Sequence, residues 1–152
     1  MNAIAFSSPD PELNRLYDIY VGISTSGAGQ SCGSTIAINN GNTPSYPTLI
    51  VHRSGGTSAV LETLRNVTNG REILFDYSLL DGEELRVDLN PLSRSILSDF
   101  FGPRLDAMLP NSDSGTFTLL PGSNYITCFV NVAGAPTITA HLEWEELFNG
   151  VD

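Results

Sequence analysis

Apolar and polar residues alternate along much of the second half of the chain. Between Arg71 and Leu79 the apolar side chains share one parity, namely Ile73, Phe75, Tyr77 and Leu79. The stretches Glu84–Leu89 and Thr137–Trp144 repeat the pattern. A period of two places alternate side chains on opposite faces of a half-buried β-strand. We therefore predict three strands here and a core that includes Ile73, Phe75, Leu85, Val87, Ile126, Ile138, Leu142 and Trp144.

Turn residues separate these runs at short intervals. Asn69-Gly70 and Asp81-Gly82 are strong hairpin signals, because both residue types tolerate a positive φ angle. Pro121-Gly122 precedes the strand-like run Tyr125–Val132, and Gly134-Ala135-Pro136 separates it from the last strand. Strands and turns in this succession predict an all-β fold, an antiparallel sandwich or barrel.

The first half of the chain is less regular. We predict strands at Leu16–Ser24, Ser34–Asn39, Thr48–Arg53 and Val60–Val67. The Ser- and Gly-rich stretch Thr25–Gly33 is predicted to be a loop. The segment Ser98–Leu109 carries the best helical signal, about two turns with Pro103 near their start.

Length and charge limit the classes of partner. The chain has 152 residues, which suits one domain, and its formal net charge is -10. It contains no lysine, and its seven arginines are scattered. Such a surface repels nucleic acid and anionic lipid, so we expect neither as a partner. No apolar run reaches the length of a membrane span.

Cys32 and Cys128 are the only cysteines. Two cysteines alone cannot hold a structural zinc ion, and Cys128 lies in an apolar run, which favours a buried free thiol. A Cys32–Cys128 disulfide is the alternative. Asn66-Val67-Thr68 is a glycosylation sequon, relevant only in a eukaryotic secretory pathway.

Histidines, serines and carboxylates are the candidate catalytic groups in this chain. His52 and His141 lie on alternating strands, where a solvated surface position is the expected role, and no Gly-x-Ser-x-Gly nucleophile motif occurs. Carboxylates cluster at Glu83-Glu84 and at Glu143, Glu145 and Glu146, and we interpret both groups as solvated strand residues. We expect no catalytic residue, no metal and no cofactor.

Aromatic side chains are the other candidates, because sugars stack on exposed rings. Trp144 and Tyr77 lie on the apolar parity of their strands, which predicts core packing. Tyr125 and Phe129 share a face that is either an exposed platform or a second buried side. The remaining tyrosines are Tyr17, Tyr20 and the loop residue Tyr46. No ligand-binding residue is assigned.

Five segments, in order, resemble the domains of siphophage tail components. They are Asn40–Ile50 (N-G-N-T-P-S-Y-P-T-L-I), Asn66–Ile73 (N-V-T-N-G-R-E-I), Asp81-Gly82-Glu83 before a strand, Phe117–Ile126 (F-T-L-L-P-G-S-N-Y-I), and a closing strand that ends in Trp144. Each turn motif alone is common, but the ordered set is specific. The segments Thr25–Gly33 and Ser98–Leu109 have no counterpart in that pattern.

The resemblance implies the C-terminal, galectin-like jelly-roll domain of a distal tail or baseplate protein, located in the virion tail and assembled in the bacterial cytoplasm. It also implies a lead-in segment at residues 1–11 from a preceding ring-forming domain, followed by one β-sandwich domain at 12–152. Partners would be other tail proteins, with host-surface glycan as a further ligand. The intact particle would hold an oligomer, and the isolated domain a monomer. The alternative is a carbohydrate-binding module on a tail or cell-surface protein; we expect no enzyme activity in either case.

Overall fold

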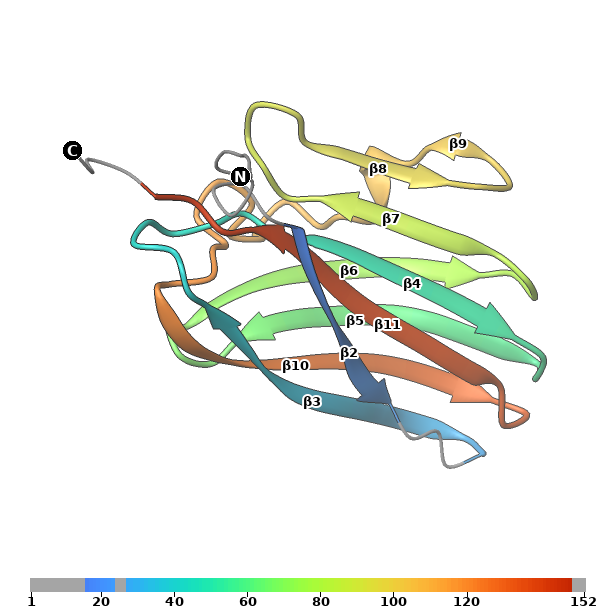
Figure 1. Ribbon diagram of the computed structural model, residues 1–152. Helices are drawn as coiled ribbons and strands as arrows, with labels where there is room; N and C mark the ends of the chain where they lie inside the picture. Colours follow the sequence, from blue (N-terminus) through green and yellow to red (C-terminus); the bar gives the residue numbers. More distant parts are fainter. Residues whose placement is uncertain (1–15, 24–26, 149–152) are drawn as a thin grey trace, which may run out of the picture.

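The computed structural model describes residues 16–23 and 27–148 and is built almost wholly of β-strands (Figure 1). The lead-in segment expected at 1–11 lies outside the described residues. In chain order, the strands are β2 (Leu16–Ile23), β3 (Gly29–Asn39), β4 (Thr48–Ser54), β5 (Ser58–Asn66), β6 (Arg71–Leu79), β7 (Glu84–Asp88), β8 (Ser95–Ser98), β9 (Gly102–Pro103), β10 (Gly122–Ala133) and β11 (Thr137–Glu145).

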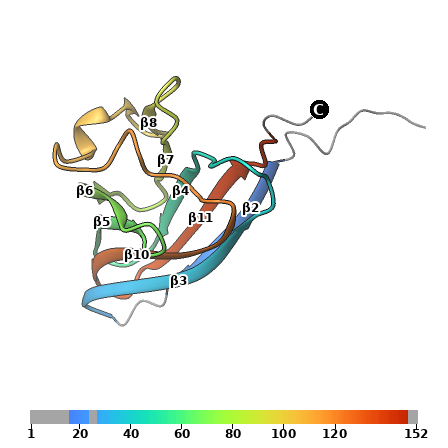
Figure 2. The same cartoon turned by 90° about the vertical axis from the view of Figure 1, so that its left-hand side faces the viewer.

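The strands form one curled sheet in the order β6-β5-β10-β3-β2-β11-β4-β7-β8-β9. Every pair of neighbours is antiparallel. The sheet folds over at β2, which pairs along most of its length with β11 and at its end with β3. Strands β6, β5, β10 and β3 thus form one layer, and β2, β11, β4 and β7 with the β8–β9 hairpin form the other (Figures 1 and 2). This arrangement confirms the all-β sandwich of jelly-roll type.

One hydrophobic core lies between the two layers. All eight side chains predicted for it are buried, and Trp144, the largest, is 4% exposed. They share one cluster with residues from both layers, among them Leu61 and Leu64 on β5 and Leu49 and Val51 on β4. Strict alternation along each strand explains this success, because the parity of a strand fixes which of its side chains face inward.

Strand β3 begins earlier than the sequence predicted. The expected loop Thr25–Gly33 ends at residue 28, and Gly29–Gly33 instead pairs with the end of β10. Side-chain propensity favours a loop there, but the complete ladder with β10 overrides it. Gly33 is needed at the fold of the sheet, since a Cβ atom on it would lie 2.6 Å from the carbonyl carbon of Gly22 on β2.

The two helical turns predicted at Ser98–Leu109 are wrong. Ser98 ends β8, Pro103 lies in the short strand β9, and only η2 (Leu105–Ala107) forms a single 3₁₀ turn. η2 contacts both β8 and β6, which are near opposite ends of the sheet order, so this segment closes the open side of the sandwich. Among residues 16–23 and 27–148, no helix has the length and apolar character to cross a bilayer.

After η2 the chain covers the free edge of β6. Leu109 N donates to Leu74 O at 2.8 Å, and Leu74 N donates to the Ser112 hydroxyl at 2.8 Å. Glu72 and Asp113 bond twice, through Glu72 N to the Asp113 carboxylate and Asp113 N to Glu72 O, each at 2.9 Å. These bonds satisfy backbone groups that an edge strand would otherwise offer to another chain.

The two predicted glycine turns behave differently. Asn69-Gly70 joins β5 to β6 as a hairpin, with Gly70 at φ 74°, as expected. Asp81-Gly82 also turns, with Gly82 at φ 86°, but β6 and β7 belong to different layers and do not pair with each other. The residue pattern therefore located the turn correctly but not the connection that it makes.

Candidate functional site

Five polar and aromatic side chains meet on the outer face of β2, β11 and β7. This β2–β11 cluster comprises Asp18, Tyr20, Arg86, His141 and Glu143. Strand pairing places Tyr20 opposite His141 and Asp18 opposite Glu143. Residues at i and i+2 of a strand share a face, so this register alone gathers four of the five side chains.

Ring stacking and polar contacts organise the cluster. The rings of Tyr20 and His141 stack with centroids 5.1 Å apart and planes 18° apart. His141 Nδ1 lies 3.2 Å from Asp18 Oδ2, and Arg86 Nη1 donates to Glu143 Oε1 at 3.4 Å. The His141 and Glu143 side chains are about one fifth exposed, whereas Tyr20 is 65% exposed. The cluster is therefore an open aromatic and charged surface with two partly enclosed polar groups at its centre.

Ile50 lies beneath this surface. It belongs to the outward parity of β4, yet only 4% of it is exposed. Its cross-strand neighbours are His141 on β11 and Arg86 on β7, on either side. Polar side chains that cover an apolar one have fewer water contacts, which strengthens the electrostatic interactions among them.

The two histidines have separate surroundings. His52 is half-buried on the outer face of β4, where strand pairing places it opposite Glu84 and Thr139. His141 alone is gathered with the carboxylates of Asp18 and Glu143. Both histidines take the outward positions that alternation predicted, but His141 is not an isolated surface residue.

The solvated position expected for Glu83 is wrong. It is fully buried and accepts hydrogen bonds from the hydroxyls of Tyr77 and Ser98 and from Leu80 N at 2.8 Å. Burial, followed by the hydrogen bond to Glu83, raises the pKa of Tyr77 above its usual value. The group is enclosed by the residues that it binds, so we assign it a structural role, which is to fix the β6–β7 turn against β8.

Arg53 supports the same region. It is 6% exposed, and its guanidinium donates to the carbonyl oxygens of Leu79, Gly55 and Gly56 at 2.7–2.9 Å. Arg53 is therefore an interior residue. Its burial is possible because three carbonyl oxygens replace the water molecules that would otherwise hydrate the guanidinium.

The second cluster of carboxylates also contains both exposed and buried members. Glu143 and Glu145 face outward, as predicted, but Glu146 is 5% exposed and accepts a hydrogen bond from Asn40 N at 3.2 Å. Its expected solvated position is therefore wrong. Glu146 follows the end of β11, where the alternation that places Glu145 outward no longer applies.

Buried asparagines hold the segments that carried the family resemblance. The Asn124 amide bonds Leu120 N, Leu120 O and Gly122 O, and its Oδ1 accepts from Asn66 Nδ2 at 3.1 Å. Asn66 also donates to Thr118 O at 2.9 Å. These contacts give Asn124 a turn-forming role. Because Asn66 is 0% exposed, its sequon offers no acceptor in the folded protein.

Both cysteines are free thiols, Cys32 exposed and Cys128 buried. The disulfide alternative is not formed, and the buried thiol is confirmed. Burial, with a smaller contribution from Cys32, raises the pKa of Cys128 to about 12. A thiol held in its neutral form is a poor nucleophile and metal ligand.

The face shared by Tyr125 and Phe129 is an outer one. Tyr125 is 45% exposed, and Phe129 is half-buried below the Arg65 guanidinium, 5.4 Å from its ring centroid. Exposed apolar side chains gather here in a β3–β10 strip, which consists of Ile36, Ile38, Val67 and Tyr125, all 45–53% exposed. Ile36 is the cross-strand partner of Tyr125, and Val67 N bonds Tyr125 O at 2.8 Å.

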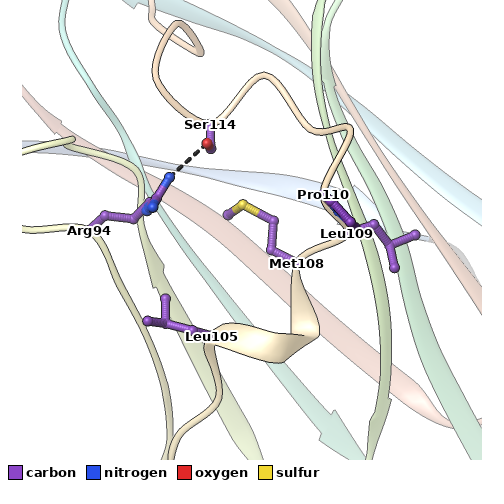
Figure 3. Close-up of a pocket in the computed structure, with 6 residues that line it drawn as sticks. All are labelled: Arg94, Leu105, Met108, Leu109, Pro110 and Ser114. Atoms are coloured by element: carbon purple, nitrogen blue, oxygen red, sulfur yellow. Dashed lines mark hydrogen bonds between the residues drawn. The ribbon is translucent and has the colours of Figure 1, made fainter.

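A pocket of about 270 Å³ lies along the segment that leads from β8 to the edge of β6 (Figure 3). Its lining residues are Arg94, Leu105, Met108, Leu109, Pro110 and Ser114. Arg94 Nη1 donates to the Ser114 hydroxyl at 2.7 Å across its rim. The lining offers apolar contact and one cation that is already hydrogen-bonded, without a carboxylate or imidazole to pair as acid and base.

Sequence reasoning missed the β2–β11 cluster as a unit. It singled out His141, Glu143 and Tyr20 separately and did not consider Asp18 or the role of Arg86. The cluster depends on the pairing of β2 with β11, two strands more than a hundred residues apart in the chain. The outward parity of each member was visible in the sequence, but the strand order was not.

A scan against protein-family models and searches of curated proteins and of solved structures each find no match to this chain.

Proposed function

We propose that this chain is a structural domain of a phage or prophage tail, similar to the C-terminal domain of a distal tail or baseplate protein, and that it works by binding neighbouring tail proteins rather than by catalysis. The observation that carries the proposal is the β3–β10 strip, an apolar area on the outer face of a rigid sandwich. The ordered turn motifs supply the resemblance, and their buried asparagines give them a structural explanation.

Exposed apolar side chains in a contiguous row favour a protein partner. Ile36 and Ile38 are each more than half exposed and lie at i and i+2 on β3, with Tyr125 and Val67 beside them. Single exposed apolar residues are ordinary, but three on one sheet face with a fourth, Val67, in the adjoining turn are typical of an interface. The partner we propose is an adjacent tail or baseplate subunit with an apolar surface of its own.

The test is complementation in the phage or lysogen that encodes the chain. Deletion of the gene should give particles without complete tails, as judged by electron microscopy, and the wild-type gene should restore them. An Ile36→Glu/Ile38→Glu variant should fold with an unchanged melting temperature but fail to restore tails. A Thr139→Glu variant, with the charge on the outer face of the other layer, is the matched control and should restore them.

Two results would contradict the proposal. One is intact, infectious tails after deletion of the gene. The other is turnover of a polysaccharide by the purified chain that is abolished by changing one carboxylate, since that would make the protein a glycoside hydrolase.

Carbohydrate binding is a second candidate, and the β2–β11 cluster favours it. An aromatic ring 65% exposed beside two carboxylates and a guanidinium offers both a stacking surface and hydrogen-bond partners for sugar hydroxyls. Such shallow sites bind weakly, because each hydroxyl gives up water to bind. On a glycan array, Tyr20→Ala should abolish any signal and Tyr125→Ala, on the opposite layer, should keep it. A signal that survives Tyr20→Ala would exclude this surface as the sugar site.

A further inference from the structure

We propose that Asp18, His141 and Glu143 form a binding site for one divalent transition-metal ion, best matched by Zn²⁺, and that the ion clamps β2 to β11. The inference concerns a ligand that neither the tail assignment nor carbohydrate binding requires, and it stands or falls independently of the tail assignment. It rests on the donor geometry, the donor chemistry and the place of β2 in the fold.

The donor atoms are already close together. One ligand atom from each of the three residues lies within 4.8 Å of the others. Ligands ~2.1 Å from a tetrahedral ion lie roughly 3.4 Å from one another, so shifts of about an ångström complete the site. His141 Nδ1 and Asp18 Oδ2, at 3.2 Å, have nearly that separation.

The donor set selects the type of ion. An imidazole nitrogen with two carboxylates suits Zn²⁺, whereas Mg²⁺ and Ca²⁺ prefer oxygen ligands alone and Cu⁺ prefers sulfur. Three protein ligands leave one tetrahedral position for water. Asp18 is the most exposed of the three, with 45% of its side chain accessible, so the ion can enter from the β2 side.

Neighbouring side chains affect how readily the proposed ligands can bind an ion. Tyr20 stacks on the His141 ring and limits its rotation, which lowers the entropy that binding must remove. Ile50, buried beneath, makes the floor of the site apolar. Arg86 opposes the ion, because it pairs with Glu143 at 3.4 Å and would be displaced or repelled. Removal of Arg86 should therefore strengthen metal binding.

The position of β2 gives the ion a structural effect. β2 is the strand at which the curled sheet passes from one layer to the other, and only its last two residues pair with β3. An ion held by Asp18 on β2 and by two residues of β11 adds a cross-link at this joint. Because an ion that binds the folded state alone shifts the unfolding equilibrium, the melting temperature should rise with Zn²⁺ concentration.

The experiment is titration calorimetry of the full chain without a polyhistidine tag, in a Cys32→Ser background. That background removes the one exposed thiol, which could bind Zn²⁺ by itself. We expect one Zn²⁺ per chain at pH 7.5 and no comparable heat with Mg²⁺, which prefers oxygen ligands alone.

Variants locate the ion. His141→Ala and Asp18→Asn should each weaken binding at least tenfold and remove the Zn²⁺-dependent rise in melting temperature. His52→Ala removes the other histidine on the same outer face and should change neither. Arg86→Ala should tighten binding several-fold, an effect that a merely structural loss would not produce. Melting curves without metal show whether each variant folds.

Zn²⁺ binding that is unaltered in His141→Ala would overturn the proposal, as would a Kd weaker than ~1 mM for the Cys32→Ser protein at pH 7.5. Loss of binding in His52→Ala with retention in His141→Ala would place the ion elsewhere on the sheet. None of these results bears on tail assembly, which the Ile36→Glu/Ile38→Glu variant tests by itself.

Discussion

Phe75 and Arg86 occupy opposite faces of their layers, and the two positions should contribute very differently to the free energy of unfolding. Phe75 faces inward on β6 and is 3% exposed, whereas the Arg86 side chain on the outer face of β7 is 47% exposed. Phe75→Ala should lower the free energy of unfolding by ~3–5 kcal/mol, because lost burial and the remaining cavity add. Arg86→Ala and Glu84→Ala should change it by less than ~0.5 kcal/mol. Urea denaturation of the three variants measures this, and equal losses would show that the faces are reversed.

Because of Cys128, the free energy of unfolding should fall as the pH rises through the alkaline range. Its folded pKa is about 12 against an ordinary 9.0, so the folded state keeps a proton that the unfolded state releases. The stability from this group is complete below pH 9 and is lost as the pH rises toward 12. Denaturation at pH 8, 9.5 and 10.5 should show this decline, and Cys128→Ala should reduce it. Cys32→Ala should reduce it only slightly, because burial of Cys128 is the larger cause of its raised pKa; a reduction as large as that in Cys128→Ala would refute the assignment.

Buried polar residues are where prediction at the residue scale failed. Glu83, Glu146 and Arg53 belong to residue types that are ordinarily at the surface, yet each is at most 6% exposed. Each finds hydrogen-bond partners in the fold, and alternation along a single strand contains no information about such partners. The apolar core, by contrast, needs only the parity of each strand and was predicted correctly.

At the scale of elements, local signals located most strands and turns but not their connections. The strand β2 was expected at Leu16–Ser24 and spans Leu16–Ile23, and the hairpin turn at Asn69-Gly70 formed as predicted. The first half of β3 and the segment Ser98–Leu109 were wrong because their structure depends on distant partners, β10 for the first and β6 for the second. Long-range pairing overrides local propensity in sheets.

The segment after η2 covers the free edge of β6, and two of its side chains accept hydrogen bonds from that strand. A Ser112→Ala/Asp113→Ala variant loses side-chain bonds to Leu74 N and Glu72 N. Two lost hydrogen bonds should cost only ~1–3 kcal/mol, but they expose an edge strand that can pair with a second molecule. We expect faster aggregation near the melting temperature, measured by light scattering. Ser114→Ala, whose hydroxyl bonds Arg94 and not β6, is the control and should aggregate like the wild type.

On the scale of the whole molecule, net charge and exposed apolar surface have opposite effects on self-association. The net charge of -10 repels copies of the chain from one another, while the β3–β10 strip attracts apolar partners. At ~0.1 M ionic strength the repulsion acts within about 10 Å, a range that shortens as salt is added. The isolated chain should therefore be a monomer at low salt, and self-association should increase with ionic strength.

Sedimentation velocity at increasing NaCl concentration tests this balance. The wild-type chain should sediment as a monomer at low salt and as a concentration-dependent mixture at high salt, because screening leaves the apolar attraction unopposed. Ile36→Glu/Ile38→Glu should remain monomeric throughout, and Thr139→Glu should behave like the wild type. A stable hexamer at low salt would contradict the prediction, since it would mean that ring formation needs no other domain. High-salt association that persists in the Ile36→Glu/Ile38→Glu variant would place the contact on another surface.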